Sequence, residues 1–74
     1  MENKLSIVLR QNAHFEFIEI ENISRLESSG VGTKFVLDND QVFYSNNAIV
    51  HFNRMFAGLK TFRKFGNKIV NLYQ

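Results

Sequence analysis

A single stretch of this chain has apolar residues at the spacing of an amphipathic α-helix. Ile49, Phe52 and Phe56 recur at intervals of three and four, which predicts one helix over about residues 47–57. Elsewhere the apolar runs are short, and in residues 4–10 apolar and polar side chains alternate as in a half-buried strand. Only one connection is long enough for a crossover, so neighbouring strands are expected to pair antiparallel. The predicted fold class is mostly β, at the margin of α+β, with antiparallel strands and one amphipathic helix.

Turn-forming residues divide the rest of the chain into segments of strand length. Apolar or extended segments cover residues 4–10, 15–20, 23–28, 34–37, 41–45, 62–65 and 69–73, which predicts four or five strands before the helix and one or two after it. The small-residue loop Ser28–Thr33 contains two glycines, which permit positive φ. The run Ser45-Asn46-Asn47 offers side chains that can cap the helix N-terminus. Gly58 occupies the position where a helix often ends with a left-handed residue.

The size of the chain restricts it to one domain, residues 1–74, with one hydrophobic core. It contains no cysteine, so neither a disulfide nor a zinc site with thiolate ligands can support the fold. Chains this short bury only about 60% of the surface that they expose when unfolded. A dense aromatic core or self-association is therefore expected, and eight Phe and two Tyr supply the aromatic side chains.

No part of the sequence indicates a membrane protein. No apolar run approaches the roughly 20 residues that a membrane-spanning helix requires. The opening residues Met1-Glu2-Asn3-Lys4 do not resemble a signal peptide. A cytoplasmic location without membrane contact is the expectation.

Catalysis and metal binding have little support in the sequence. His14 and His51 are the only imidazoles, and neither has an acidic residue at metal-ligand spacing. The pair Gly30 and Gly32 lacks the following helix, the third glycine and the lysine-threonine pair of a phosphate-binding loop. We expect a protein that is not an enzyme and that holds no metal or cofactor.

The charges are distributed unevenly along the chain. Residues 1–40 carry seven acids and four bases, a net charge of −3, whereas residues 41–74 carry five bases and no acid, a net charge of +5. An uncancelled positive field attracts polyanions, of which nucleic acid is the commonest. A solvated basic surface that keeps a small domain soluble is the alternative reading of the same charges.

Two segments are candidates for contact with nucleic acid. The first is the glycine loop with its flanking strand, where the candidate residues are Ser29, Gly30, Thr33 and Lys34. The second supplies Arg63, Lys64 and Lys68 for phosphates and Asn67 for a base edge, adenine by preference. Phe65 is expected to anchor this segment in the core, although it could instead stack on an unpaired base.

Five landmarks follow one another along about residues 5–74. They are Ile23-Ser24-Arg25-Leu26-Glu27-Ser28, the glycine loop and lysine strand of Gly30–Leu37, the turn Asp38-Asn39-Asp40, the helix of Asn47–Leu59, and the stretch Phe62-Arg63-Lys64-Phe65-Gly66-Asn67-Lys68-Ile69-Val70-Asn71. The last one is similar to a family motif that reads Phe-x-Arg/Lys-x-His-Arg/Asn-Ser-x-x-Val-Asn. In this order the landmarks resemble the LytTR-type DNA-binding domain of bacterial transcription regulators.

The resemblance implies a mostly β domain with one helix that presents loops, rather than a recognition helix, to the major groove of duplex DNA. The matching positions are Ser28–Thr33 and Lys64–Lys68. The implied function is sequence-specific duplex DNA binding by a bacterial transcription regulator, with double-stranded DNA as the partner.

The chain departs from the family at the base-reading position, where Gly66 has no side chain. Lys64, Asn67 or Lys68 could substitute, or specificity could be reduced. The family also continues into a further strand hairpin, so this sequence is a truncated piece or a shortened relative. An incomplete sheet has an open strand edge, which leads us to expect a homodimer or larger assembly formed by edge pairing.

Two other functions remain open from the sequence. A protein-interaction or oligomerisation module on the same scaffold, which has lost base reading, is favoured by Gly66 and by the missing hairpin. Single-stranded nucleic-acid binding through Phe65 and Tyr73 is the third hypothesis.

Overall fold

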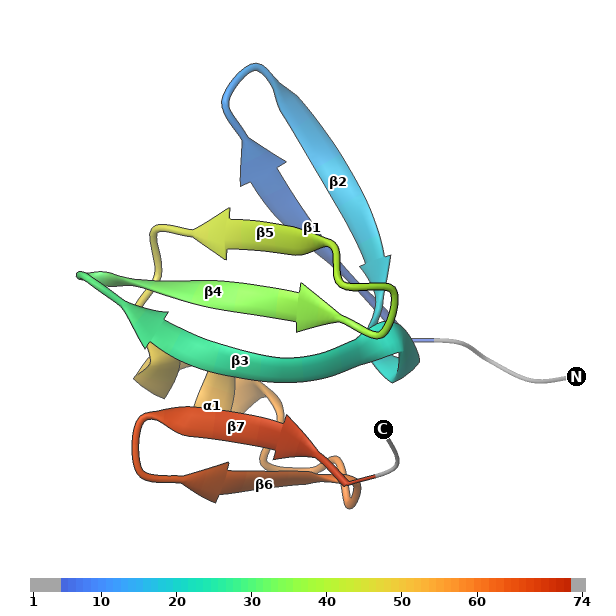
Figure 1. The fold of residues 1–74 in the computed structure, drawn as a ribbon, viewed down its shortest axis with the longest axis vertical. Coiled ribbons are helices and arrows are strands. Elements are labelled where there is room, and N and C mark those ends of the chain that lie inside the picture. The colour runs from blue at the N-terminus through green and yellow to red at the C-terminus, as the bar shows by residue number, and fades with distance from the viewer. Residues whose placement is uncertain (1–4, 73–74) are drawn as a thin grey trace, which may run out of the picture.

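The computed structural model of the protein describes residues 5–72, and this part of the chain forms seven strands, one short 3-10 helix and one α-helix (Figure 1). In chain order the elements are β1 (Ser6–Gln11), β2 (His14–Glu19), η1 (Ile20–Asn22), β3 (Ile23–Ser29), β4 (Gly32–Leu37), β5 (Val42–Ser45), α1 (Ile49–Met55), β6 (Phe62–Phe65) and β7 (Lys68–Asn71). The predicted fold class, mostly β with antiparallel strands and one helix, is confirmed.

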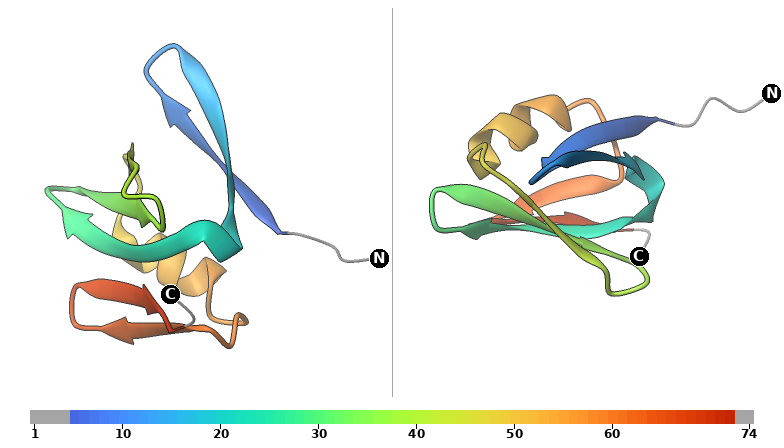
Figure 2. Two further views of the ribbon diagram at one scale, coloured as in Figure 1. Left: turned by 45° about the vertical axis from the view of Figure 1, so that its right-hand side comes forward. Right: turned by 90° about the horizontal axis from the view of Figure 1, so that it is seen from above.

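The strands form two antiparallel sheets. Strands β1 and β2 make a hairpin, and the other five make a sheet in the order β5-β4-β3-β7-β6. The helix and the β1–β2 hairpin both lie on one side of the five-stranded sheet, as the view from above in Figure 2 shows. No element of residues 5–72 covers the opposite side, which we call the outer face.

The core lies between the five-stranded sheet, the helix and the β1–β2 hairpin. Its buried members come from nearly every element, namely Ile7, Leu9, Ile18, Ile23, Leu26, Phe35, Leu37, Phe52, Phe56, Phe62 and Ile69. The ring of Phe52 meets Phe35 edge-on at a centroid distance of 4.8 Å, and Phe56 lies 4.9 Å from Phe62. These pairs attach the helix to β4 and to β6, so aromatic packing supplies the compact core that the composition predicts.

The helix differs from its sequence prediction in length and in both caps. It covers Ile49–Met55 rather than residues 47–57, and its N-cap residue, Ala48, makes no side-chain capping bond. The hydroxyl of Ser45 instead accepts a hydrogen bond of 3.1 Å from the backbone amide of Asn47, ahead of the helix. Gly58 does not have positive φ, so the prediction of a left-handed residue there is wrong.

The two glycines of the β3–β4 loop serve different purposes. Gly30 has a φ of +58°, the left-handed region that favours glycine, and Gly66 in the β6–β7 turn has nearly the same value, +57°. Gly32 lies outside that region, and a Cβ added to it would overlap the carbonyl oxygen of Ser45 on the neighbouring strand. Gly32 is therefore required for close approach of two backbones rather than for an unusual φ.

Candidate nucleic-acid interface

The two candidate segments lie side by side at one end of the five-stranded sheet. Strand β7 pairs antiparallel with β3 and places Lys68 opposite Glu27. The backbone amide of Ser28 then donates a hydrogen bond of 3.0 Å to the carbonyl oxygen of Asn67. As a result the β3–β4 turn and the β6–β7 turn project from the same end of the sheet (Figure 1). We call this end the turn end.

Both turns at the turn end have the same construction. Each is a two-residue loop, Gly30-Val31 in one and Gly66-Asn67 in the other, closed by the flanking pairs of the strand ladders. In each loop the first residue is a glycine with positive φ, which is the pattern of a type II′ turn. The second residue is exposed in both cases, and Val31 is 89% exposed. The turn end therefore presents one apolar and one amide side chain at its two tips.

One carboxylate organises the positive charges behind these turns. Arg25 Nε donates a hydrogen bond of 2.7 Å to Glu27 Oε2, Lys34 Nζ lies 3.4 Å from Oε1, and Lys68 Nζ lies 3.9 Å from Oε2. The hydrogen bond from Arg25 lowers the pKa of Glu27, and the nearby Lys34 adds to this effect against the opposing influence of burial. Three cations around one anion leave this cluster with a net positive charge.

Acidic side chains gather at the opposite end of the same strands. Asp38 and Asp40 lie in the turn between β4 and β5, whose backbone bonds to Asn22, and Glu21 belongs to η1. Asp38, Asp40 and Glu21 lie away from the turn end. These carboxylates therefore do not offset the positive potential of the turn end.

The predicted phosphate contacts do not all share one surface. Arg63, Lys64 and Lys68 are all exposed. Lys64 pairs directly with the buried Ile69, so it lies at the edge of the helix-covered face, whereas Arg63 and Lys68 lie on the outer face. The three cations therefore surround the β6–β7 hairpin rather than forming a single row.

Two residues of the glycine-loop prediction have a structural role. Thr33 is fully buried, and its hydroxyl donates a hydrogen bond of 2.8 Å to the carbonyl oxygen of Asn47. It cannot reach a base edge, so the expectation that it contacts DNA is wrong. Lys34 is only 32% exposed and is paired with Glu27, whereas Ser29 and Gly30 are exposed at the turn.

Sequence reasoning missed Arg25 and Glu27 as members of the site. Arg25 and Glu27 flank the buried Leu26 along β3. Because side chains alternate between the two faces of a strand, this pattern could have predicted that both lie together on its polar face. No short stretch of sequence could show that Lys34 and Lys68, on the two neighbouring strands, would lie on either side of Glu27. That result depends on the register of three strands.

The two histidines lie in different surroundings. A ring nitrogen of His14 lies 3.1 Å from Glu16 Oε1 on β2, and His51 packs its ring against Phe52. Within residues 5–72 no group of three potential ligands is placed to hold a metal ion. No helix in this range has the length and apolar character to cross a membrane.

Comparisons with family models, with curated proteins and with solved structures gave no match for this chain.

Proposed function

We propose that this chain is the DNA-binding domain of a bacterial transcription regulator, and that it inserts the turn end into the major groove of duplex DNA. The observation that carries the proposal is the hydrogen bond between Ser28 and Asn67, which holds two hairpin turns side by side. The major groove is about 12 Å wide and admits a two-stranded β-ribbon. Each of the two short turns is the tip of a two-stranded hairpin, so each has a shape suited to entering the groove.

The residues at the turn tips suggest how a sequence would be read. The carboxamide of Asn67 can pair with the N6 and N7 edge of adenine, and the apolar Val31 can contact the methyl group of thymine. Arg63, Lys64 and Lys68 surround the same hairpin and can hold phosphates on either side of the groove. Thr33 has no part in this proposal because it is buried.

The direct test is a selection from random duplexes at a fixed salt concentration. An enriched motif supports a regulator, uniform recovery indicates only attraction to a polyanion, and no recovery contradicts the proposal. If about four phosphates are neutralised, the logarithm of affinity should fall with the logarithm of salt concentration at a slope near −3.6. Association that does not depend on salt would contradict the mechanism.

Variants at the β6–β7 hairpin distinguish residues that contact phosphates from residues that recognise bases. Lys64→Ala should weaken binding to all duplexes alike and reduce the salt slope by about one. Asn67→Ala should instead change the preference between sequences. Lys60→Ala is the matched control, because Lys60 is exposed but precedes β6 at the end away from the turns. Identical behaviour of all three variants would contradict the proposed roles.

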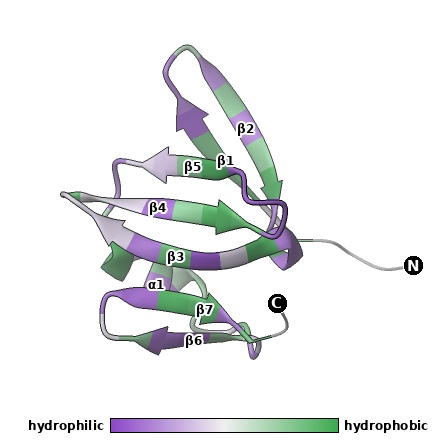
Figure 3. Ribbon diagram, in the orientation of Figure 1, coloured by the Kyte–Doolittle hydropathy of each residue, from purple (hydrophilic) through white to green (hydrophobic). Residues whose placement is uncertain are grey.

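A second candidate function, protein interaction, is favoured by the exposed side of the β1–β2 hairpin. Val8 pairs with Phe17 there, and Phe15 lies two residues away on the same side. Phe15 is 63% and Phe17 is 77% exposed, which is unusual for such large apolar side chains. Figure 3 shows hydrophobic and hydrophilic residues alternating along β2.

Analytical sedimentation measures whether two copies of the protein associate through this apolar side of the β1–β2 hairpin. Under the second candidate function, the protein should associate at micromolar concentration, and Phe17→Ser should convert it to a monomer. A folded monomer at high micromolar concentration would remove self-association, both through this side and through the open edge of β6.

A further inference from the structure

The outer face of the five-stranded sheet carries an ordered row of side chains. Strand register places Tyr44 opposite Lys34, Lys34 opposite Glu27, Glu27 opposite Lys68, and Lys68 opposite Phe65. Residues directly opposite each other share a face of the sheet. The row therefore runs across all five strands, with an aromatic ring on each edge strand and charged side chains between.

A second row lies beside the first one on the same face. Its members, in order from β5 to β6, are Val42, Val36, Arg25, Val70 and Arg63. The alternation of buried Leu26, Phe35 and Ile69 toward the core confirms that both rows point away from it. Together the rows hold four cations and one carboxylate, a net charge of +3.

The aromatic side chains of the first row are accessible. Tyr44 is 54% exposed and Phe65 is 57% exposed. No element within residues 5–72 covers this face, and its centre holds the paired cations, the buried Val36 and the half-buried Val70. Since β5 and β6 are separated by four strand spacings, the two rings stand about 19 Å apart across the sheet.

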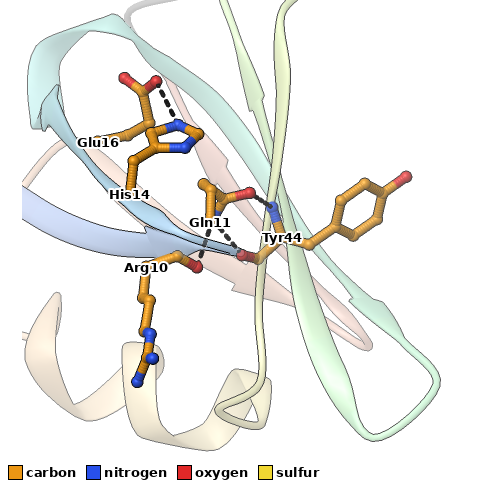
Figure 4. A network of polar contacts seen from close by, with 5 residues as sticks. All are labelled: Arg10, Gln11, His14, Glu16 and Tyr44. Carbon is orange, nitrogen blue, oxygen red and sulfur yellow. Dashed lines mark hydrogen bonds and ion pairs between the residues drawn. The ribbon is translucent and has the colours of Figure 1, made fainter.

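The Tyr44 ring is held on a fixed backbone. The side-chain amide of Gln11 donates a hydrogen bond of 2.6 Å to the Tyr44 carbonyl oxygen, and its oxygen accepts one of 3.4 Å from the Tyr44 amide. Figure 4 shows that the ring points away from Gln11 and from Arg10, which reaches toward the helix. Gln11 thus occupies the polar groups of this edge strand while the ring stays free to contact a ligand.

We propose that the outer face binds single-stranded nucleic acid, with Tyr44 and Phe65 stacking on bases and with Lys34, Lys68, Arg25 and Arg63 contacting phosphates. Exposed aromatic rings on a positively charged sheet are how proteins bind single strands, because every base has a face that can stack. A duplex hides its base faces, so stacking on these rings requires an unpaired strand. This function goes beyond duplex recognition at the turn end. It depends on the rings of Tyr44 and Phe65, which the duplex proposal does not use, and the two proposals share only Arg63 and Lys68 as phosphate contacts.

The test is fluorescence anisotropy of the whole chain with labelled oligothymidylate and oligouridylate of about 12 nucleotides, within the site sizes known for such sheets. We expect saturable binding that weakens with salt. Tyr44→Ala and Phe65→Ala should each weaken it by about fivefold or more. The ratio between the two oligonucleotides reports whether DNA or RNA is the preferred strand.

Phe17→Ala is the matched control, because it removes a ring that is more exposed than Tyr44 or Phe65 but lies on the other sheet, and it should leave binding unchanged. The proposal is overturned if neither oligonucleotide binds saturably, if Tyr44→Ala and Phe65→Ala bind as the wild type does, or if Phe17→Ala weakens binding equally. It is also overturned if the free protein is a dimer that Tyr44→Ala dissociates, since a second copy would then cover the face.

Duplex binding is measured in parallel so that the two proposals can fail separately. Asn67→Ala should alter duplex preference and leave oligothymidylate binding within about twofold. Tyr44→Ala should do the reverse, because β5 lies three strands away from β7. If no duplex sequence is selected but oligothymidylate still binds through Tyr44 and Phe65, the proposal of base recognition at the turn end is contradicted and the proposal for the outer face is supported.

Discussion

Lys34 and Lys68 come from segments more than thirty positions apart in sequence, yet they approach the two oxygens of the same Glu27 carboxylate from either side. Lys34 Nζ lies 3.4 Å from Oε1 and Lys68 Nζ lies 3.9 Å from Oε2. The anion offsets part of their repulsion, so the sheet can hold two lysines and Arg25 close together. The same anion also reduces the attraction of this face for a polyanion.

Replacing Glu27 with glutamine should therefore strengthen binding to nucleic acid. Two unit charges about 4 Å apart interact by roughly 1 kcal/mol in water, which corresponds to about a fivefold change in affinity. Glu27→Gln should bind oligothymidylate about fivefold more tightly at low salt, and the gain should shrink as salt is added. Anisotropy titrations at two salt concentrations measure both effects.

Glu16→Gln is the control for this substitution, because it removes the same charge from β2, on the other sheet. It should change affinity far less than Glu27→Gln does. Equal gains from the two variants would mean that only net charge matters and that the cluster around Glu27 has no special position.

The stability that Glu27 contributes should depend on pH in a defined direction. Its pKa in the folded state is lowered from 4.5, chiefly by the hydrogen bond from Arg25. A lowered folded pKa means that the contribution is present above the unfolded pKa and is lost as pH falls through the folded pKa. The difference in urea midpoint between wild type and Glu27→Gln should therefore be largest near pH 7 and shrink below about pH 4.5. A difference that grows on acidification would contradict the ion cluster.

The sequence was informative where one strand or one turn decides the structure. Alternation in residues 4–10 located β1, the spacing of Phe52 and Phe56 located the helix, and Gly30 marked a turn with positive φ. Each of these features depends on residues that are close together in the sequence. That is the range over which propensity and periodicity act.

Sequence reasoning failed where distant segments meet. Thr33 was expected at a DNA surface, but the segment before the helix passes over it, and its hydroxyl satisfies the carbonyl of Asn47. Gly58 was expected to be left-handed, but the helix ends at its C-cap Phe56, and Gly58 lies in a further turn closed by the hydrogen bond from the Leu59 amide to the Phe56 carbonyl oxygen. The outer face, with Tyr44 and its neighbours, appears only once the register of five strands is known.

The buried hydroxyl of Thr33 should matter for stability rather than for recognition. Thr33→Val keeps the shape of the side chain and leaves the Asn47 carbonyl without its donor, at a cost of about 1–3 kcal/mol. Thr33→Ser retains the hydroxyl and serves as the control for the bond itself. Urea denaturation should find Thr33→Val less stable than Thr33→Ser. A Thr33→Val protein with wild-type stability and an altered base preference would instead show that Thr33 contacts bases.

Gly32 should tolerate substitution far less well than Gly58. An added Cβ at Gly32 meets the Ser45 backbone, which cannot move without disturbing the β4–β5 ladder, whereas Gly58 has open space and no positive φ. Gly32→Ala should cost about 1–3 kcal/mol, as overpacking usually does. Gly58→Ala should be neutral or stabilising by up to about 1 kcal/mol. Thermal unfolding of the pair measures this, and equal melting temperatures would argue against the close approach of β4 and β5.

Gln11 should control how firmly β5 is held against the β1–β2 hairpin. Its side-chain amide takes the place of a neighbouring strand by pairing with both backbone polar groups of Tyr44. Gln11→Ala should release this clamp at a cost of about 0.5–1.5 kcal/mol. The amide of Tyr44 should then exchange with solvent faster than in the wild type, because its acceptor has been removed.

Gln11→Glu provides the contrast, since it keeps an oxygen to accept from the Tyr44 amide but loses the donor to the Tyr44 carbonyl. Amide exchange followed by NMR should therefore show intermediate protection at Tyr44 in this variant. Because the clamp fixes the backbone that carries the ring, Gln11→Ala should also weaken oligothymidylate binding although Gln11 lies off the outer face. If amide exchange at Tyr44 is unchanged in both variants, the pairing of β5 with β4 is sufficient to hold β5. The position of the Tyr44 ring would then depend on the sheet and not on Gln11.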